Sequence, residues 1–330
     1  MRVLITGVAG FSGRHLAELC TRYGAEVIGL GRRELSAEER PAGLDAYIAA
    51  DLNDSGQAEE ALRSAAPERV FHLAAEASVA ASWADPSRIV LSNIRSAQNL
   101  LEAVRREAPD ASVLAAGSGE IYGPVPPSKL PVSEAQELSP QNPYAVSKAA
   151  VDLLAGFYAD AHGLAVVRTR AFNHAGPGQS DAYVVSTLAR QVASAEAEAR
   201  AAGRNGMATV VTGNPEARRD FTDVRDVVRA YWSVLEAVER GVFNVCSGSS
   251  VSAAEIVESL QRLTPLSIQQ RTDPARLRKS EVMELRGSPE ALTDATGWKP
   301  EIAFETTLND TLRWWRRKLE REPGGGAERS

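Results

Sequence analysis

Short apolar runs alternate with helical hydrophobic patterns over the first half of the chain. The runs are short enough for buried strands, and the segments between them carry the spacing of helices that bury one face. The predicted strands cover residues 3–5, 26–30, 45–51, 69–75, 112–117 and 164–170. The predicted helices between them cover residues 15–23, 55–65, 93–106 and 144–161. This alternation predicts an α/β fold of the Rossmann type, with a doubly wound parallel sheet and right-handed crossovers.

The regular alternation of strands and helices ends at Asn173. The pattern beyond it predicts a smaller C-terminal α/β lobe that binds substrate. Its expected elements are helices 183–201, 226–238, 253–263 and 308–320, and strands 208–212 and 242–246. We expect a first domain over 1–172, to which the chain returns at about 215–245. The lobe then takes 173–214 and 246–320, and the apolar-poor tail 321–330 is expected to be disordered.

Composition narrows the class of protein. The chain has 330 residues, 44% hydrophobic and 24% charged, with a net charge of −6. The acidic balance does not favour nucleic acid or an anionic membrane as a partner. Cys20 and Cys246 are expected to be reduced, because two cysteines in a long chain do not form a disulfide framework. No metal site is expected, and the lack of a membrane-length apolar run or signal peptide predicts a cytoplasmic protein.

The first predicted strand is followed by a glycine-rich turn. Gly7, Gly10 and Gly13 form a G-x-x-G-x-x-G pattern that opens a helix, with Phe11 and Ser12 inside it. Glycines let the backbone approach a pyrophosphate, which the helix N-terminus then faces. The five residues are therefore predicted to bind a dinucleotide, and the alternative is a glycine-rich turn without a ligand.

The ends of the next two strands bear on the choice of cofactor. Gly31 stands where NAD-binding proteins usually carry an acid, and Arg32 and Arg33 follow it. Arginine forks suit the 2′-phosphate of NADP, so NADP(H) is predicted over NAD(H). The alternative is that both arginines are solvated surface charges. Asp51 with Leu52 is predicted to meet the adenine, and an Asp51 helix cap is an equal alternative.

Four residues further along are candidates for the chemistry. Tyr144 and Lys148 are four apart on a predicted helix and so share one face. A nearby positive charge lowers the pKa of a phenol and suits it to proton transfer during carbonyl–alcohol redox chemistry. Ser118 and Glu120 follow the fifth predicted strand, where α/β sheets bind ligands. Taken separately, Tyr144 and Lys148 could be a chance helical pair, Ser118 a loop serine, and Glu120 a carboxylate at the start of a helix.

Together these motifs resemble the extended short-chain dehydrogenase/reductase family, in the branch that acts on nucleotide-linked hexoses. The matching segments are Gly7–Gly13, Asp51-Leu52, His72–Ala75, Ser118–Gly123, Tyr144–Lys148 and Arg219–Val224. The resemblance implies that Tyr144 is the catalytic acid/base, that Lys148 holds the nicotinamide ribose, and that Ser118 holds the substrate C4 oxygen. It further implies cofactor contacts from Leu73, Ala74, Ala75 and Asn93. It also implies a homodimer, formed through helices 93–106 and 144–161.

Within this branch, the segment Arg170–Gln179 is similar to the GDP-4-dehydro-6-deoxy-D-mannose reductases. The expected reaction is NADPH-dependent reduction of that GDP-sugar to GDP-D-rhamnose. Glu120 leaves GDP-mannose 4,6-dehydration open, because dehydratases keep a second acid/base at this position. Epimerisation or reduction of another nucleotide hexose also stays open, as does a non-catalytic cofactor-binding regulator.

The resemblance implies a further set of residues for the nucleotide sugar. Arg219 and Arg278 are expected to hold the diphosphate. Glu281 is expected at the ribose, although Lys279 departs from the family's proline two residues before it. The remaining candidates for substrate contact are Ser78, Asn173, Gln179 and Arg190. His72 and His174 are expected to be structural, because Tyr144 already supplies the proton.

Overall fold

A seven-stranded parallel sheet forms the larger part of the molecule. A computed structural model describes residues 1–203, 206–277 and 282–321. The strand order is β11-β6-β5-β4-β1-β2-β3, and every neighbouring pair is parallel. The strands are β1 (Arg2–Thr6), β2 (Glu26–Gly31), β3 (Ala46–Ala49), β4 (Arg69–His72), β5 (Ser112–Ser118), β6 (Val166–Ala171) and β11 (Gly241–Val245). The predicted doubly wound α/β fold is confirmed.

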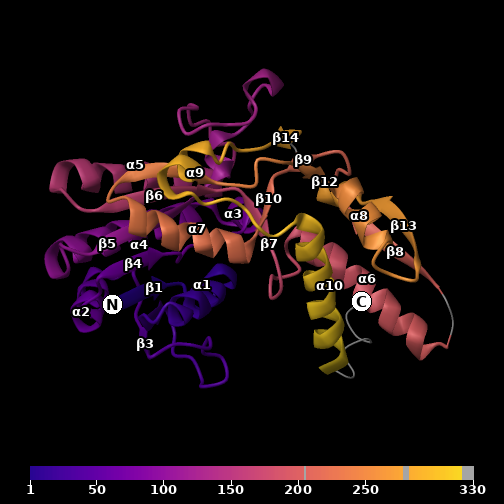
Figure 1. Ribbon diagram of the computed structural model, residues 1–330, viewed down its shortest axis with the longest axis horizontal. Helices are drawn as coiled ribbons and strands as arrows, with labels where there is room; N and C mark the ends of the chain where they lie inside the picture. The colour runs from indigo at the N-terminus through magenta and orange to yellow at the C-terminus, as the bar shows by residue number, and fades with distance from the viewer. Residues whose placement is uncertain (204–205, 278–281, 322–330) are drawn as a thin grey trace.

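Helices cover both faces of this sheet, as Figure 1 shows. Alternate strand residues supply the two cores, so that Val3 and Ile5 face one helical layer and Leu4 faces the other. The first layer holds α1 (Phe11–Arg22), α7 (Val224–Ala237) and α9 (Glu290–Thr296). The second layer holds α2 (Ser55–Ala65), α4 (Pro86–Glu107) and α5 (Pro143–His162), with α3 (Val79–Ala84) packed against α4 and α5.

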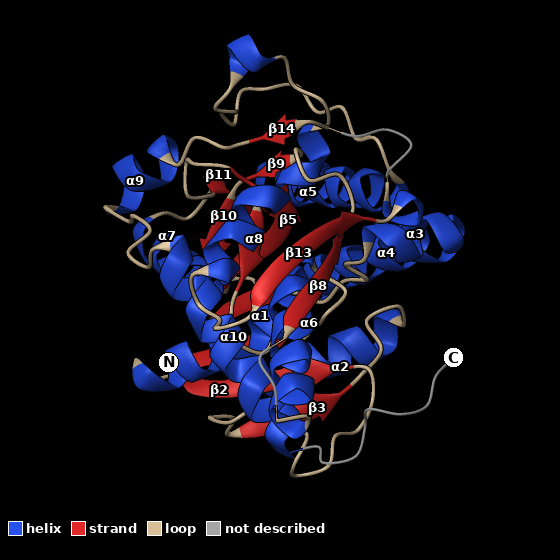
Figure 2. Ribbon diagram, turned by 90° about the vertical axis from the view of Figure 1, so that its right-hand side faces the viewer, coloured by secondary structure: helices blue, strands red, loops and turns tan. Residues whose placement is uncertain are grey.

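A smaller α/β region lies beside the sheet, at the right of Figure 1 and facing the viewer in Figure 2. Its core is formed by α6 (Val184–Ala201), α8 (Ala253–Gln261) and α10 (Phe304–Arg321) around β8 (Met207–Thr212) and β13 (Ser267–Thr272). Short strands line the boundary: β7 (Asn173–Ala175), β9 (Arg218–Arg219), β10 (Phe221–Asp223), β12 (Val251–Ser252) and β14 (Glu284–Leu285). Three single turns complete the described elements: η1 (Gly119–Tyr122), η2 (Pro127–Lys129) and η3 (Pro274–Arg276).

Three boundaries differ from those expected. Helix α4 begins at Pro86 rather than near Asn93, because Asp85 caps it and a proline suits the first helical position. Leu292 and Trp298 pack into the core of the large sheet, although the predicted boundary assigned them to the smaller lobe. Arg321, expected in the disordered tail, ends α10, and the rest of that tail lies outside the described residues.

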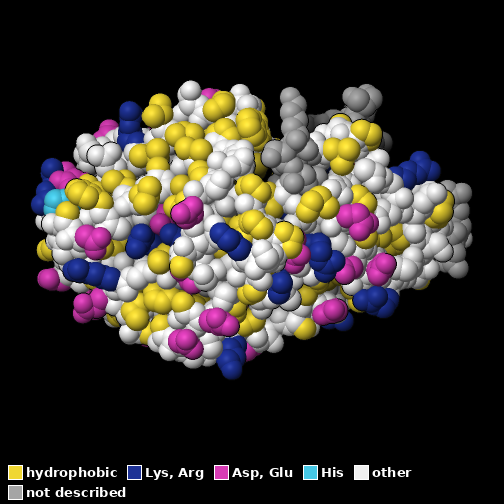
Figure 3. Space-filling model, turned by 90° about the horizontal axis from the view of Figure 1, so that it is seen from above, with side chains coloured by type: hydrophobic (Ala, Val, Ile, Leu, Met, Phe, Trp, Pro, Cys, Tyr) yellow, Lys and Arg dark blue, Asp and Glu magenta, His cyan; other side chains and the backbone are white. Residues whose placement is uncertain are grey.

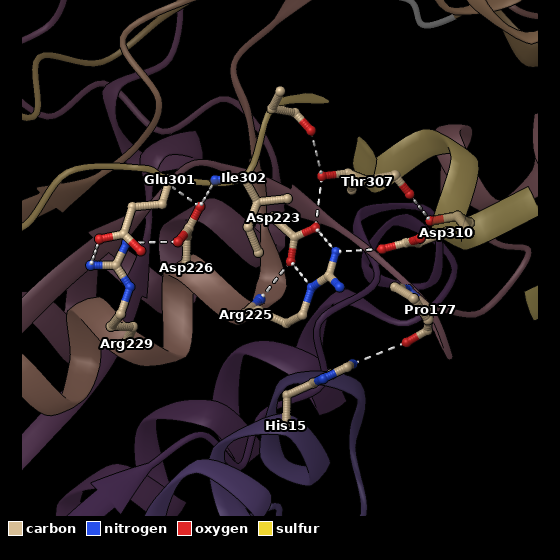
Figure 4. A network of polar contacts seen from close by, with 12 residues as sticks. His15, Pro177, Asp223, Arg225, Asp226, Arg229, Glu301, Ile302, Thr307 and Asp310 are labelled. Carbon is tan, nitrogen blue, oxygen red and sulfur yellow. Dashed lines mark hydrogen bonds and ion pairs between the residues drawn. The ribbon is translucent and has the colours of Figure 1, made fainter. Parts of the chain in front are cut away.

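Two aspartates at the start of α7 connect the large sheet to the C-terminal helix (Figure 4). Asp223 caps α7 and accepts a hydrogen bond of 2.7 Å from Thr307 of α10. Asp226 accepts hydrogen bonds from the backbone amides of Glu301 and Ile302, at 2.9 and 2.8 Å. These bonds set the position at which the smaller region meets the sheet.

Basic and acidic side chains are interspersed over the face in Figure 3, without a large patch of one sign. Among the residues that the structure describes, none of the helices has the length and apolarity required to cross a membrane. The same described part of the chain brings no three His, Cys, Asp or Glu residues together in a way that could hold a metal ion.

Candidate active site

The glycine loop has the shape of a phosphate cradle. Gly7 has a φ of +70°, and a Cβ there would lie 2.9 Å from the Ala74 backbone. A Cβ on Gly13 would lie 2.5 Å from the Gly7 carbonyl oxygen, so both positions require glycine. Gly10 is the N-cap of α1, and no side chain caps this helix. The first amides of α1, from Phe11 onward, can therefore meet a pyrophosphate, and the loop fits a dinucleotide.

Thr6 and His72 hold the Leu73–Ala75 segment against the glycine loop. The Thr6 hydroxyl accepts from the Ala74 amide at 3.1 Å and lies 2.9 Å from His72 Nδ1. Burial lowers the pKa of His72 to about 3, so its ring is neutral at physiological pH. These bonds give His72 the structural role that was expected for it.

Asn93 is buried behind the segment that follows β4, and it is not exposed at the surface of that segment. Its side-chain oxygen accepts from the Glu76 amide at 2.9 Å, and its amide group donates to Ser147 Oγ at 2.9 Å and to the Glu76 carbonyl at 3.3 Å. Buried and bonded on both sides, Asn93 ties the segment after β4 to α5. This differs from the predicted direct contact with the cofactor.

The residues expected near the adenosine end are engaged by neighbouring groups. Arg32 forms a 3.0 Å ion pair with Glu76, and Arg33 forms a 2.6 Å pair with Glu39. Both guanidinium groups are mostly exposed, so they can exchange these carboxylates for a phosphate at little cost. Asp51 does not cap a helix: it accepts from Asn53, while a different aspartate caps α2.

Three of the predicted catalytic residues converge at the carboxyl end of β5. Ser118 ends β5, and Tyr144 and Lys148 lie on the buried face of α5. This helix begins at Pro143 because Asn142 caps it: the Asn142 side-chain oxygen accepts from the Ala145 amide at 2.8 Å. The Ser118 side chain lies close enough to the Tyr144 hydroxyl to lower its pKa, so the predicted serine and tyrosine meet in the folded chain.

The protonation state of Tyr144 differs from the expectation. Burial raises the pKa of Tyr144, and the hydrogen bond from Ser118 only partly opposes this. Lys148 donates to the Ala116 carbonyl at 2.7 Å, and burial lowers the pKa of its ammonium to about 8. Desolvation is therefore the largest influence on the pKa of Tyr144, and it acts in the opposite direction to the one expected from the lysine.

Glu120 and Tyr183 also act on Tyr144. The Glu120 carboxylate accepts from the Asn142 side chain at 3.3 Å, and its charge raises the pKa of Tyr144. Tyr183, at the start of α6, raises this pKa as well. Tyr183 was not among the predicted residues, because only folding brings the smaller region to α5.

A buried polar network next to η1 was also not predicted from the sequence. Arg170 of β6 donates to both carboxylate oxygens of Asp152, at 3.1 and 3.0 Å, and to the Tyr122 hydroxyl at 3.0 Å. Tyr122 ends η1 and donates to Asn244 of β11 at 2.7 Å. The network thus joins η1, which carries Glu120, to α5. An arginine inside an apolar strand pattern, and an aspartate one turn after Lys148, were the available signals.

Five of the predicted substrate residues lie in the described part of the chain, and two lie outside it. Asn173 lies on β7 at the boundary, and Gln179 is buried close by, donating to the His174 carbonyl at 2.8 Å. Ser78 caps α3, and Arg190 forms an ion pair with Asp181. Arg219 lies on β9 and donates to the Val282 carbonyl at 2.7 Å, whereas Arg278 and Glu281 lie outside the described residues.

Asp220, next to Arg219, organises this end of the smaller region. Its carboxylate accepts from the Ser247 amide and hydroxyl at 2.8 and 2.6 Å, and from the amides of Gly248 and Gly287 at 3.0 and 3.3 Å. Burial nevertheless raises the pKa of Asp220 to about 6. One carboxylate thus fixes three segments around the candidate phosphate site.

Comparisons with known proteins agree with this geometry. The family model described as GDP-mannose 4,6 dehydratase matches residues 4–311. The chain is 34% identical to GDP-6-deoxy-D-mannose reductase of Pseudomonas aeruginosa, over 97% of this chain and 99% of that one. It is 28% identical to GDP-mannose 4,6 dehydratase 1 of Arabidopsis thaliana, over 92% and 86%.

Solved structures are similar over nearly the whole chain. The structure of RMD from Pseudomonas aeruginosa complexed with NADPH has a TM-score of 0.82 and 31% identity, covering 96% of this chain and 100% of that one. The UDP-glucose 4-epimerase of Thermus thermophilus, in complex with NAD, has a TM-score of 0.82 and 30% identity, covering 96% and 99%. The chain therefore belongs to the extended short-chain dehydrogenase/reductase family, in its NAD-dependent epimerase/dehydratase branch, and is a nucleotide-sugar-modifying member.

Proposed function

We propose that the protein is an NADPH-dependent reductase that converts GDP-4-dehydro-6-deoxy-D-mannose to GDP-D-rhamnose. The observation that carries this proposal is the buried Tyr144 next to Ser118 at the carboxyl end of β5, with a pKa that burial raises. A ketone reductase needs a proton donor at this point, and a raised pKa keeps the phenol protonated. The similarity to the Pseudomonas aeruginosa reductase over 97% of the chain supports the choice of substrate.

In this proposal, separate residues of the chain transfer the proton, hold the sugar oxygen and hold the cofactor. When bound, the reduced nicotinamide supplies the hydride that is delivered to the sugar C4. Tyr144 donates its proton to the C4 oxygen, and Ser118 holds that oxygen in place. We assign Lys148, one helical turn from Tyr144 along α5, to stabilise the phenolate that is left behind. Arg32 and Arg33 hold the 2′-phosphate, which favours NADPH over NADH.

A second candidate is 4,6-dehydration of GDP-mannose. Glu120 favours it, because this carboxylate follows Ser118 by two residues and lies close enough to raise the pKa of Tyr144. Dehydration requires a second acid/base beside the tyrosine. The chain is, however, less similar to the Arabidopsis thaliana dehydratase, at 28% identity, than to the Pseudomonas aeruginosa reductase, at 34%. We therefore rank it second.

One assay separates the two candidates. The protein is incubated with GDP-mannose, with and without a separate GDP-mannose 4,6-dehydratase, while NADPH absorbance and sugar products are followed. We expect NADPH to be consumed in equal amount to the keto sugar, only when the dehydratase is present, and NADH to be used less efficiently. Conversion of GDP-mannose by this protein alone, without net loss of NADPH, would instead establish the dehydratase.

We also propose that two copies of the chain pair through α4 and α5. These helices lie side by side and expose apolar side chains: Leu91 on α4, and Val146, Leu153 and Phe157 on α5. Leu153 and Phe157 are 63% and 56% exposed and lie one turn apart, so they share one outward face. Exposed apolar side chains grouped on helices are typical of an interface.

Charged substitutions on this face test the pairing. We expect the wild-type protein to be a dimer by light scattering, and Leu153→Glu with Phe157→Glu to give a folded monomer, because two buried charges oppose association. Glutamates at Tyr23 and Met207, which are 51% and 61% exposed elsewhere on the surface, are the matched control and should leave the dimer intact. A monomeric wild-type protein would contradict the proposal.

A further inference from the structure

The start of α1 contacts the segment 173–179 through two histidines. Ser12 Oγ lies 2.9 Å from His174 Nε2, and His15 Nε2 lies 3.0 Å from the Pro177 carbonyl oxygen. Figure 4 shows His15 reaching from α1 toward Pro177. Phe11 stacks on His174, with ring centroids 5.9 Å apart and planes at 3°. Residues of the glycine loop therefore touch a segment more than 160 positions away in the sequence.

His174 also organises its own segment. Its carbonyl oxygen accepts from Gln179 Nε2 at 2.8 Å, and its Nδ1 lies 3.2 Å from the Phe172 carbonyl oxygen. The ring bonded to the Phe172 carbonyl through Nδ1–H presents Nε2 as the acceptor for Ser12. One side chain therefore connects the glycine loop to the segment that carries both Asn173 and Gln179.

The fit between the segment and α1 leaves little space. Gly176 has a φ of +157°, and a Cβ there would lie 2.8 Å from Val224 Cγ1 and 3.7 Å from Phe11 Cζ. The segment is thus packed between α1 and α7, and it cannot shift without moving Phe11 or breaking the two histidine contacts.

We propose that His15 and His174 are positioning residues that join the two ligand sites, so that occupation of the dinucleotide site further restrains the segment 173–179. Phosphate groups at the start of α1 fix the backbone of Phe11 and Ser12. Ser12 and Phe11 then hold the His174 ring, and His174 holds Gln179 through its carbonyl oxygen. That this segment faces the nucleotide sugar rests on the proposed function, whereas its response to the dinucleotide does not.

Hydrogen exchange of the backbone amides, followed by mass spectrometry, tests this link without a substrate. In the wild-type protein, saturating NADPH should slow exchange in peptides covering 173–179 by at least about fivefold, the lower end of coupling between sites. In the double variant His15→Phe and His174→Phe, NADPH should leave these peptides unchanged. Phenylalanine keeps the ring and the stacking on Phe11 but removes both nitrogen contacts.

Two further variants keep the test decisive. Ser12→Ala removes the partner of His174 from the opposite side and should also weaken the response. Thr307→Val loses a buried 2.7 Å bond to Asp223 without touching α1, so it should keep the full response. NADPH occupancy is matched in every variant by titration of cofactor fluorescence.

The outcomes separate this inference from the proposed function. Equal slowing in the wild-type protein and the double variant, at equal NADPH occupancy, would overturn the coupling, as would no slowing in the wild-type protein. An intact exchange response in a protein that does not reduce the GDP-linked keto sugar would overturn the substrate assignment alone.

Discussion

Tyr144→Phe is expected to lower turnover of the keto sugar by about 10²- to 10⁴-fold, the range typical of a lost general acid. The buried phenol hydroxyl next to Ser118 is the proton donor that we assign to the C4 oxygen, and burial raises its pKa. Phenylalanine retains the ring, so the packing of α5 should persist. Steady-state kinetics with NADPH and the keto sugar measure the loss.

The matched control lies on the same helix. Tyr158 is also buried on α5, and its hydroxyl contacts Glu102 at 3.4 Å, away from Ser118. Tyr158→Phe should keep turnover within about twofold and serves as the reference for any general effect of losing a hydroxyl. NADPH affinity should be similar in both variants. Turnover by Tyr144→Phe above about a tenth of the wild-type value would contradict the assigned role.

Much of the large sheet could be predicted, because its strands are continuous apolar runs between helices of regular period. The two-residue strands β9, β12 and β14 could not, since Arg218–Arg219, Val251–Ser252 and Glu284–Leu285 have no periodicity and gain their pairing only from the folded chain. The start of α4 at Pro86 was readable from the Asp-Pro pair, but the apolar pattern placed it later.

Part of the candidate site could likewise be predicted from the sequence, and part of it could not. Gly7, Ser118, Tyr144 and Lys148 belong to motifs that are local in sequence, so their approximate positions followed from the order of the strands. The pKa of Tyr144 could not be predicted, because it depends on how deeply α5 is buried and on where Lys148 points. The Arg170 network likewise depends on contacts between β6, α5 and η1 that only the fold creates.

Arg170→Met is expected to lower the free energy of unfolding by about 3 kcal/mol, the lower end of the range for breaking a buried ion pair. The cost arises because Asp152, which is 2% exposed, keeps a charge without its two bonds from Arg170. Arg168 stays 3.4 Å from Asp152 and offsets part of this cost, which is why the lower end applies. Urea denaturation followed by tryptophan fluorescence measures the change.

Two companion variants separate the buried charge from the network's effect on the catalytic turn. Arg168→Met should cost less than about 1 kcal/mol, because this arginine is 26% exposed and Asp152 retains Arg170. Adding Asp152→Leu to Arg170→Met should recover much of the lost stability, since the only charge then left without its partner, Arg168, is partly exposed. Turnover should be below the wild-type value in Arg170→Met and in that double variant alike, because in both Tyr122 lacks the arginine that holds η1 against α5. Recovery of stability and turnover together would show that the network only stabilises the fold and does not position Ser118, the residue that precedes η1.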